Sequence, residues 1–530
     1  LAFDNGEAVP DATYTEHIPF DHIKASLQVP VGAPLAKALF NSSSRSSRRH
    51  AWINKNPQAA AAAAEEGLIP GGIVDSPAPG SESTSQLGSP TAASPATAAS
   101  DVFAAAAAIA EKRKQQTVYM DSAAATIIDP AVQEAISRAP VGNPNSLHTI
   151  GRVCRAAVEG VRHQLLSFLC PSLATPFKLA FTSGGTEANN IAIGGLASML
   201  RTGDEALGKP AVLLYSSVAH PSIIEVCKKL AANGKVALAE AVPVRPDGHL
   251  DIAALEKLLA KYSAFKNGGL NFTDGRGTRQ EDSRPWANVA LAFDVVNHEL
   301  GTLRDGAAIA KLCRAHGALV HADACQALCK VDVDATLYDA VAVTAHKING
   351  PTGIGAVAVR AKLVAAMEPV MAGGSFDGEI RPGTLNAPGI VGFGAALSLH
   401  RDEEHAAMVF ESLVSSVEAL GADAVRINGT PRQSSGRILH MTLTGASPAL
   451  RKMDDAEIVG YFATRHNVML STGAACSQHK SGDESSASNL YTRLGVSPGP
   501  TLRVSIDHNT SKADVARFMT ALNELLTKIK

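Results

Sequence analysis

Lys347 and Asp323 are the residues of this sequence whose types and spacing point most directly to chemistry. Lys347 follows the apolar run 340–344 and precedes a turn at Gly350. Its amine could carry an aldehyde cofactor as a Schiff base, while Asp323, at the end of an earlier apolar run, could keep a pyridinium nitrogen protonated. A single lysine near a strand end is usually a solvated surface charge. The pair indicates pyridoxal phosphate chemistry, in which the cofactor is the electron sink.

A candidate phosphate site lies in residues 181–190, Phe-Thr-Ser-Gly-Gly-Thr-Glu-Ala-Asn-Asn, which follow an apolar run and open a helix. The backbone N–H groups of Gly185 and Thr186, together with the threonine hydroxyl, would form an anion site at a helix N-terminus. An ordinary capped turn is the alternative for so short a motif. Thr344 and His346 are further candidates for phosphate donors.

Two other side chains could contact the ring of such a cofactor. His220 lies just past an apolar run, where an imidazole could stack on an aromatic ring and shuttle protons. A hydrogen-bonded core histidine is the alternative. Gln326, three residues after Asp323, could donate to a phenolate oxygen from the first turn of a helix.

A thiol is the candidate nucleophile, and a guanidinium is the candidate group for binding the substrate. Cys476 lies in a polar, loop-like stretch with His479 and Lys480 nearby, the kind of surroundings in which nucleophilic cysteines are found. A thiol without a catalytic role is the alternative. Arg503, on the expected strand 501–505, could hold a substrate carboxylate through two hydrogen bonds. A solvated arginine on an edge strand is the alternative.

The elements that must position these residues begin at Thr117, where apolar runs start to alternate with helix-like stretches. The runs cover residues 178–182, 211–215, 289–293, 318–322 and 340–344. This alternation predicts an α/β fold with a largely parallel sheet. After about residue 403, mixed strands and helices end in an amphipathic helix over 512–528, which predicts a smaller α+β domain. The polar, Gly-rich segment 266–285 predicts a surface insertion.

The composition, with a formal net charge of −2 and 45 % hydrophobic residues, is ordinary for a water-soluble protein. It contains no strongly basic stripe for nucleic acid and no apolar run near the roughly 18 residues of a membrane span. Seven scattered cysteines indicate reduced, intracellular thiols rather than a disulfide framework. Cys325 and Cys329 have no His or Cys pair at zinc spacing beside them, so no metal site is expected.

The first 115 residues differ from the rest, because they are rich in Ala, Ser, Pro and Gly and lack periodicity. We expect them to be disordered. Residues 23–64 contain no Asp or Glu, and Arg45, Arg48 and Arg49 lie among serines, as in an organelle-targeting presequence. Five acids in the first 22 residues leave a plain disordered extension as an equal alternative. A mitochondrial location is therefore expected, with the cytoplasm as the alternative.

Taken together, the motifs resemble the class V aminotransferase family, and within it the branch of cysteine desulfurases and selenocysteine lyases. The similarity extends from about Tyr119 to the C-terminus, with the motifs in the family's order. They cover residues 143–148, 182–187, 219–220, 297–301, 321–326, 345–347, 381–384 and 473–476. The first 115 residues have no counterpart in this resemblance.

The resemblance implies the fold type I of pyridoxal phosphate-dependent transferases. A large cofactor-binding domain with a mostly parallel seven-stranded sheet would cover 133–403. A smaller α+β domain, formed by 117–132 and 404–530, would carry the cysteine loop. The resemblance also implies a homodimer, in which Thr384 reaches the phosphate of the partner subunit.

Roles in cofactor binding transfer residue by residue. Lys347 would form the Schiff base and move a proton at the substrate Cα, and Asp323 would pair with the pyridine nitrogen. Gln326 would bind the phenolate oxygen, and His220 would stack on the ring. The phosphate would be bound by Gly185, Thr186, Thr344 and His346.

On the substrate side, the resemblance implies that Arg503 and Asn297 bind the amino acid and that Cys476 attacks its sulfur or selenium. The chain also departs from the family pattern. His298 stands where an asparagine is usual near the phenolate oxygen, residues 373–377 read Gly-Gly-Ser-Phe-Asp, and Asp-His at 507–508 replaces Gly-Arg. These departures concern substrate geometry and rate rather than cofactor binding.

The leading hypothesis is a cysteine desulfurase that converts L-cysteine to L-alanine and passes a persulfide sulfur to an acceptor protein, for iron–sulfur clusters or thio-modification. The alternative is a selenocysteine lyase acting on L-selenocysteine. Residues 381–384 and 473–476 resemble that branch of the family somewhat more closely. A non-catalytic scaffold would have lost Lys347 or Asp323. A lyase or transaminase without a nucleophile would not need Cys476.

Overall fold

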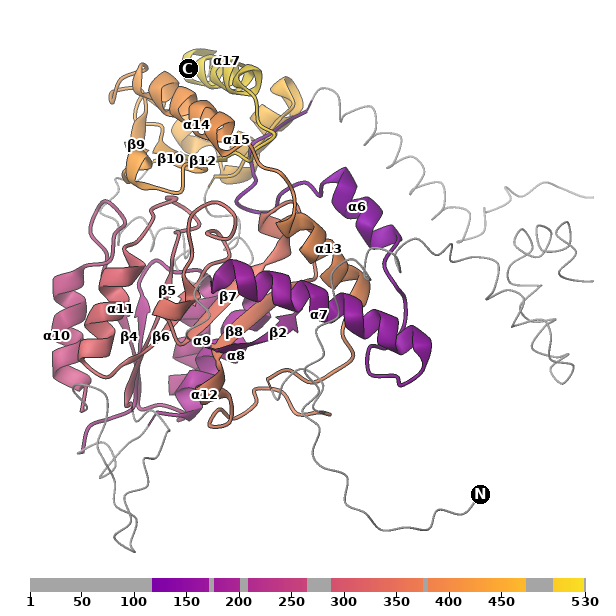
Figure 1. Cartoon of the computed structure of the whole chain (residues 1–530). Helices are drawn as coiled ribbons and strands as arrows, with labels where there is room; N and C mark the ends of the chain where they lie inside the picture. Colours follow the sequence, from indigo (N-terminus) through magenta and orange to yellow (C-terminus); the bar gives the residue numbers. More distant parts are fainter. Residues whose placement is uncertain are drawn as a thin grey trace, which may run out of the picture. The chain divides into compact units, whose positions relative to one another are not determined.

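The computed structural model describes residues 117–170, 176–200, 208–264, 287–374, 380–472 and 499–528. They are the coloured parts of Figure 1. The predicted disordered extension, the predicted insertion over 266–285 and the loop with Cys476 lie outside the described residues.

A seven-stranded sheet forms the centre of the larger part of the described chain. Its order is β2-β8-β7-β6-β5-β3-β4. The strands are β2 (Phe177–Thr182), β3 (Val212–Ser216), β4 (Leu238–Val242), β5 (Val289–Asp294), β6 (Leu319–Asp323), β7 (Ala340–Thr344) and β8 (Gly355–Arg360). Only β8 runs against its neighbours, and the other pairs are parallel. The predicted α/β fold with a mostly parallel seven-stranded sheet is confirmed.

Helices cover both faces of this sheet (Figure 1). They are α6 (Pro130–Ser137), α7 (Thr149–Leu169), α8 (Gly185–Ser198), α9 (Pro221–Ala232), α10 (Ile252–Tyr262), α11 (Gly306–Ala315), α12 (Ala361–Val364) and α13 (Ala387–Leu397). Alternate residues of a strand face opposite sides, so Val212 and Leu214 pack in one apolar core and Leu213 and Tyr215 in the other. Burial on both faces explains why the strands read as continuous apolar runs.

A second, three-stranded antiparallel sheet has the order β12-β10-β9. Its strands are β9 (Arg426–Asn428), β10 (Ile438–Thr442) and β12 (Thr501–Ser505). The helices beside it are α14 (Glu403–Glu418), α15 (Asp455–Tyr461) and α17 (Lys512–Lys528), with the short helices η4 (Pro431–Gln433) and η5 (Leu450–Lys452) and the π-helix η6 (Phe462–His466). Two further short helices, η2 (Ala335–Leu337) and η3 (Ala345–Lys347), flank β7 of the larger sheet.

The first strand of the described chain lies outside both of these sheets, in a two-stranded sheet of its own. β1 (Val118–Tyr119) pairs in parallel with β11 (Val468–Met469). Met120 packs in the same apolar core as Phe518 and Leu522. The chain therefore crosses from this core to the larger sheet through the residues just after Met120. The domain boundaries at 133 and 403 stay a prediction.

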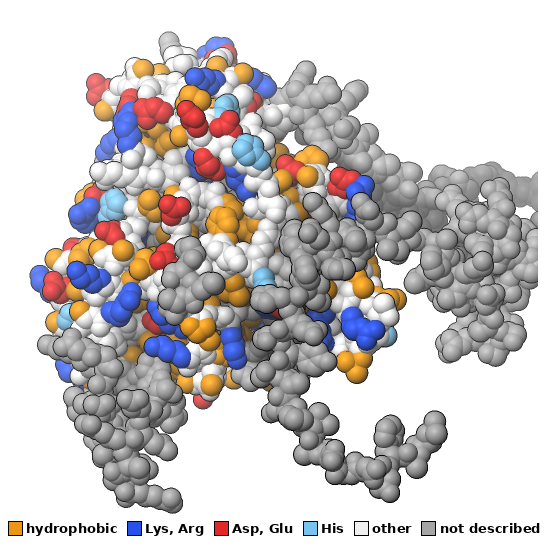
Figure 2. Space-filling model, in the orientation of Figure 1, with side chains coloured by type: hydrophobic (Ala, Val, Ile, Leu, Met, Phe, Trp, Pro, Cys, Tyr) orange, Lys and Arg blue, Asp and Glu red, His pale blue; other side chains and the backbone are white. Residues whose placement is uncertain are grey.

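The described surface mixes both signs of charge. On the face drawn in Figure 2, Lys and Arg side chains are interspersed with Asp and Glu side chains. Among the described helices, none is both long and apolar enough to cross a membrane. The described residues also contain no cluster of three or more His, Cys, Asp or Glu that could hold a metal ion.

At Gly301 the turn after β5 packs closely on β10. Its φ is +71°, and a Cβ there would lie 2.8 Å from the carbonyl oxygen of Ile438. Gly234 has a similar φ of +68° with nothing within 4 Å of such a Cβ. Gly234→Ala should therefore cost only the roughly 1–2 kcal/mol of left-handed backbone. Gly301→Ala should cost more, and its midpoint of thermal unfolding should fall further. Equal midpoints for the two variants would contradict this packing.

Candidate active site

Most of the predicted site residues meet at one edge of the seven-stranded sheet. β8 is antiparallel to β2 and β7, so the carboxyl ends of β2, β3, β5, β6 and β7 share that edge. Gly185, His220, Asn297, Asp323 and Lys347 all follow or end these strands. The carboxyl edge of such a sheet is where α/β proteins bind ligands.

Asp323 is held by a buried polar network. Its side chain is almost fully buried, and its two oxygens accept hydrogen bonds from the backbone N–H of Cys325 at 2.9 Å and from Asn189 Nδ2 at 2.8 Å. Asn189 Oδ1 lies 2.8 Å from His321 Nε2, and its Nδ2 also reaches the hydroxyl of Ser222. Sequence reasoning missed Asn189 and Ser222. The signal for Asn189 was a polar residue inside an otherwise apolar helix, since buried polar groups must find partners.

His220 stands at the start of α9 and is the next member of this network. Its Nδ1 accepts a hydrogen bond from the backbone N–H of Ser222 at 3.1 Å. Burial lowers the pKa of His220, the charge of Asp323 opposes this effect, and the charge of Lys347 adds to it. A neutral ring that accepts at Nδ1 carries its proton on Nε2. The imidazole ring lies edge-on to the ring of His298, with 5.1 Å between the centroids.

Lys347 ends η3 and points to the segment that follows β1. Its Nζ donates to the carbonyl oxygens of Ala123 and Ala124, the latter at 2.7 Å. Gln326 Nε2 donates to the same Ala123 oxygen at 2.8 Å, and Gln326 Oε1 accepts from Lys330 Nζ at 3.1 Å. Lys330 was not predicted. Burial lowers its pKa to about 7, and the positive charge of Lys347 contributes.

One local expectation about Gln326 is wrong. The residues after Asp323 form a succession of turns through Lys330 and not an α-helix. Cys329 has a left-handed φ of 57°, which no residue of a right-handed helix adopts. Gln326 therefore reaches the site from a turn.

The predicted phosphate turn has the geometry of an anion site. Gly184 precedes α8 with no side-chain hydrogen bond capping the helix, so its first N–H groups are not bonded by a cap. A Cβ at Gly185 would lie 2.5 Å from the sulfur of Cys325, which explains the glycine. Thr344 Oγ1 lies 2.9 Å from His346 Nδ1. Burial lowers the pKa of His346 to about 4, and the charges of Lys347 and Lys330 contribute.

Arg381 ties a distant segment to this turn. Its Nε lies 2.9 Å from Glu187 Oε1, and Glu187 Oε2 accepts from the backbone N–H of Ser183 at 2.5 Å. Burial raises the pKa of Glu187, but hydrogen bonds from Ser183 and Arg381 outweigh it and leave the pKa below its ordinary value. Thr384, three residues on, is exposed. Its role in a partner subunit stays a prediction.

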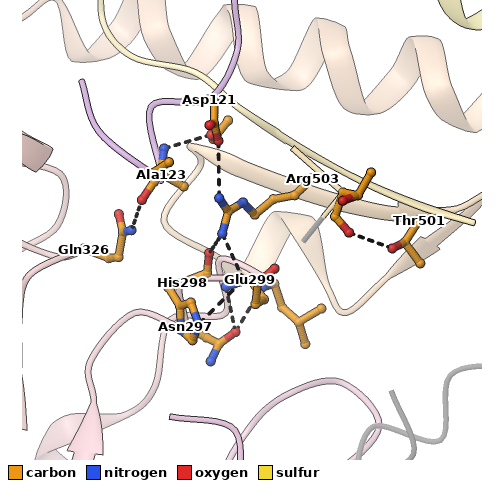
Figure 3. A network of polar contacts seen from close by, with 12 residues as sticks. Asp121, Ala123, Asn297, His298, Glu299, Gln326, Thr501 and Arg503 are labelled. Atoms are coloured by element: carbon orange, nitrogen blue, oxygen red, sulfur yellow. Dashed lines mark hydrogen bonds and ion pairs between the residues drawn. The ribbon is translucent and has the colours of Figure 1, made fainter. Parts of the chain in front are cut away.

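Arg503 faces the site from β12 and is not a solvated edge arginine. It is only 4 % exposed. Its Nη1 donates to Glu299 Oε1 at 2.9 Å and to the carbonyl oxygen of His298 at 3.2 Å, and its Nη2 donates to Asp121 Oδ1 at 3.3 Å (Figure 3). Sequence reasoning missed Asp121 and Glu299 as its partners.

Asn297 organises the turn that presents Glu299. Its Nδ2 donates to Asp294 Oδ2 at 2.8 Å and to the carbonyl oxygen of Val218, while its Oδ1 accepts from the backbone N–H groups of Glu299 and Leu300. Both ends of the amide are thus used within the protein. A direct contact between Asn297 and substrate stays a prediction.

His298 occupies the position where the family pattern has an amide. Burial lowers its pKa well below the ordinary value, and nearby positive charges including Arg503 and Lys347 act in the same direction. Its Nδ1 is buried and has no hydrogen-bond partner among the described residues. The ring is therefore neutral and has one polar atom available for a ligand.

Comparison with known proteins decides the family. The model of the family "Aminotransferase class-V" matches residues 118–265 and 286–518. The chain belongs to the class V aminotransferase family. The predicted resemblance to this family is confirmed.

The names of similar proteins agree with that assignment. The chain is 31 % identical over 330 residues to the cysteine desulfurase IscS of Aeromonas salmonicida, covering 60 % of this chain and 72 % of that one. It is 31 % identical over 296 residues to "Cysteine desulfurase, mitochondrial" of Drosophila melanogaster, covering 54 % and 56 %. Its fold is similar to a NifS-like protein from Rickettsia africae, with a TM-score of 0.59, 23 % identity and coverage of 77 % and 99 %.

Replacing Asn189 tests the network around Asp323. Asn189→Ala leaves Asp323 Oδ2 and His321 Nε2 without their buried partner, which typically costs about 1–3 kcal/mol. The carboxylate should then hold a pyridine nitrogen less firmly, and the dissociation constant for pyridoxal phosphate should rise about tenfold or more. An absorbance titration measures this constant. Asn190→Ala is the matched control, because Asn190 Nδ2 bonds the Thr186 carbonyl of the same helix. Equal affinities in the two variants would contradict the role of Asn189.

Proposed function

We propose that this class V aminotransferase is a pyridoxal phosphate-dependent cysteine desulfurase, which converts L-cysteine to L-alanine. The names of its relatives support this reaction. The observation that carries the proposal is the gathering of Lys347, Asp323 and His220 at one sheet edge, opposite Arg503. Burial lowers the pKa of His220, the charge of Asp323 raises it, and the charges of Lys347 and Arg503 lower it, so all three charged groups lie close enough to act on this ring.

The donor set fits pyridoxal phosphate. Asp323 offers a buried carboxylate to a pyridine nitrogen, and the glycine turn at Gly185 offers the start of α8 to a phosphate. Thr186, Thr344 and His346 would add donors to that phosphate. Gln326 and the unpartnered Nδ1 of His298 would lie near the phenolate oxygen. When bound, this cofactor supplies an electron sink for the substrate carbon.

The chain's own residues then have separate tasks. Arg503 holds the substrate carboxylate, and Lys347 takes and returns the proton at Cα. His220, neutral and edge-on to His298, orients the ring from one face. The Cys476 thiolate attacks the substrate sulfur, so that an S–S bond forms while the Cβ–S bond breaks. One cysteine and one thiol thus give one alanine and one persulfide, with no external oxidant.

The persulfide implies a recipient. We propose that Cys476 passes its sulfur to an acceptor protein or thiol, for iron–sulfur cluster assembly or thio-modification. The protein would act as a homodimer, with Thr384 reaching the phosphate of the other site. A mitochondrial location is supported by the name of the Drosophila relative and by the acid-free segment 23–64, with the cytoplasm as the alternative.

Lys347→Ala should abolish the visible absorbance of bound pyridoxal phosphate. Without the amine, the cofactor has no covalent bond to the chain, so the Schiff-base band is absent and the unbound cofactor is removed on purification. The spectrum of the purified variant, compared with that of Lys330→Ala, measures this effect. A Lys347→Ala protein that stayed yellow while Lys330→Ala lost its colour would overturn the assignment.

Alanine release from L-cysteine, with added reductant, tests the function itself. The wild-type protein should release alanine, and Cys476→Ser should lose nearly all of this activity because its hydroxyl cannot form a persulfide. Cys170→Ser is the control, since Cys170 lies at the end of α7. Alanine release that survived Cys476→Ser unchanged would contradict the persulfide step. Release from L-selenocysteine alone would make the protein a selenocysteine lyase.

A further inference from the structure

Arg503 already has two acidic partners before any substrate is considered. Glu299 Oε1 lies 2.9 Å from Nη1, and Asp121 Oδ1 lies 3.3 Å from Nη2. The three side chains come from the turn after β5, the segment after β1 and strand β12. Figure 3 shows the guanidinium between the two carboxylates. A substrate carboxylate that binds Arg503 must enter this arrangement as a third acid.

The charges of this cluster would not balance if all three acids were ionised. One guanidinium would face three carboxylates in a place where Arg503 is 4 % and Glu299 5 % exposed. Charges of one sign repel strongly away from water, and the usual relief is that one carboxyl takes up a proton. Lys347 is a second positive charge that acts on Glu299. In the proposed reaction it is engaged with the cofactor, so it does not cancel the excess.

Glu299 is the carboxyl best placed to carry that proton. Its Oε1 accepts from Arg503, but its Oε2 is buried and has no hydrogen-bond partner among the described residues. A buried carboxylate oxygen without a donor is costly, whereas an O–H at that position can donate to an incoming carboxylate. The side chain of Asp121 is more exposed, at 23 %, and is better able to stay ionised.

The balance of burial and charge around Glu299 also favours its protonated form. Burial raises the pKa of Glu299 to about 7, Arg503 and Lys347 oppose this effect, and Asp121 adds to it. His298, whose Nε2 lies 3.6 Å from Glu299 Oε1, brings no charge because its own pKa is well below the ordinary value. A carboxylate added beside Glu299 can only raise the affinity of Glu299 for a proton further.

We propose that Glu299 is a substrate-positioning residue that binds the substrate carboxylate as a neutral acid, sharing Arg503 with it and taking up one proton as the substrate enters. This inference rests on the proposed function, since it takes Arg503 as the group that holds the substrate carboxylate. It goes beyond that function by making substrate binding, rather than the chemical steps, dependent on pH near neutrality.

The sign of the pH dependence follows. Well below its pKa of about 7 Glu299 is already protonated, and binding of a carboxylate is independent of pH. Above pH 7 the protein must first take up a proton, so the dissociation constant rises about tenfold per pH unit. In Glu299→Gln the side chain is neutral at every pH and keeps a donor, so this rise is absent.

The test uses the holoenzyme and 3-mercaptopropionate, which keeps the carboxylate and thiol of cysteine but lacks the amine. Its competitive inhibition constant against L-cysteine is measured from pH 6 to about 9, within which its carboxylate stays ionised. The wild-type constant should rise about tenfold per unit above pH 7. Glu299→Gln should give a flat profile. Asp121→Asn should move the rise to lower pH, because Asp121 raises the pKa of Glu299.

Calorimetry on the wild-type protein alone gives a second measurement. At pH 8, binding of 3-mercaptopropionate in buffers of different ionisation enthalpy should show uptake of about one proton. No uptake, or parallel profiles for wild type and Glu299→Gln, would overturn the proposal even if alanine release from L-cysteine stands. Proton uptake in a protein that releases no alanine would support the role of Glu299 while the proposed function failed.

Discussion

The buried guanidinium of Arg503 is the interaction on which the site depends. It contacts the segment after β1, the turn after β5 and, through its own strand, the second sheet. A buried positive charge must be paired, because isolated charges are expensive to remove from water. The three segments are therefore held in register at the place where a substrate would bind. Because of the same pairing, an anion that binds Arg503 must share the guanidinium with Glu299 and Asp121.

The acid that faces the cofactor position depends on a different kind of support. Asp323 obtains its orientation from Asn189 and from a backbone N–H, and Asn189 in turn contacts His321 and Ser222. Such a network is stable because every buried polar atom in it has a partner. It also couples the start of α9, and with it His220, to the end of β6. One helix residue thereby places two candidate site residues.

The unusual histidine at 298 fits this arrangement without adding charge. Its ring is buried, neutral and edge-on to His220, and it lies beside the carboxyl of Glu299. A protonated imidazole there would pair with Glu299 and compete with Arg503 for it. Because burial keeps His298 neutral, the arginine remains the main partner of that carboxyl. The replacement of an amide by an imidazole thus leaves the charge of the cluster unchanged.

The sequence by itself determined the local features of this protein. The apolar run 340–344 coincides with β7, and the amphipathic helix over 512–528 is α17. The other predicted runs differ from their strands by one residue at one end or at both. These features depend on periodicity and on residue type, and both can be read within a short window. The lysine, the aspartate and the glycine turn were found because each directly follows or ends such a run.

The partners of those residues were decided only by the tertiary structure. Arg503 meets Glu299 across 204 residues and Asp121 across 382, and Gln326 meets Ala123 across 203. Sequence periodicity covers short windows and cannot predict contacts between residues so far apart in the chain. Asp121, Glu299, Asn189 and Lys330 therefore look like ordinary polar residues in the sequence. Burial is what makes their contacts and protonation matter, and burial arises only when the two sheets and the segment after β1 come together.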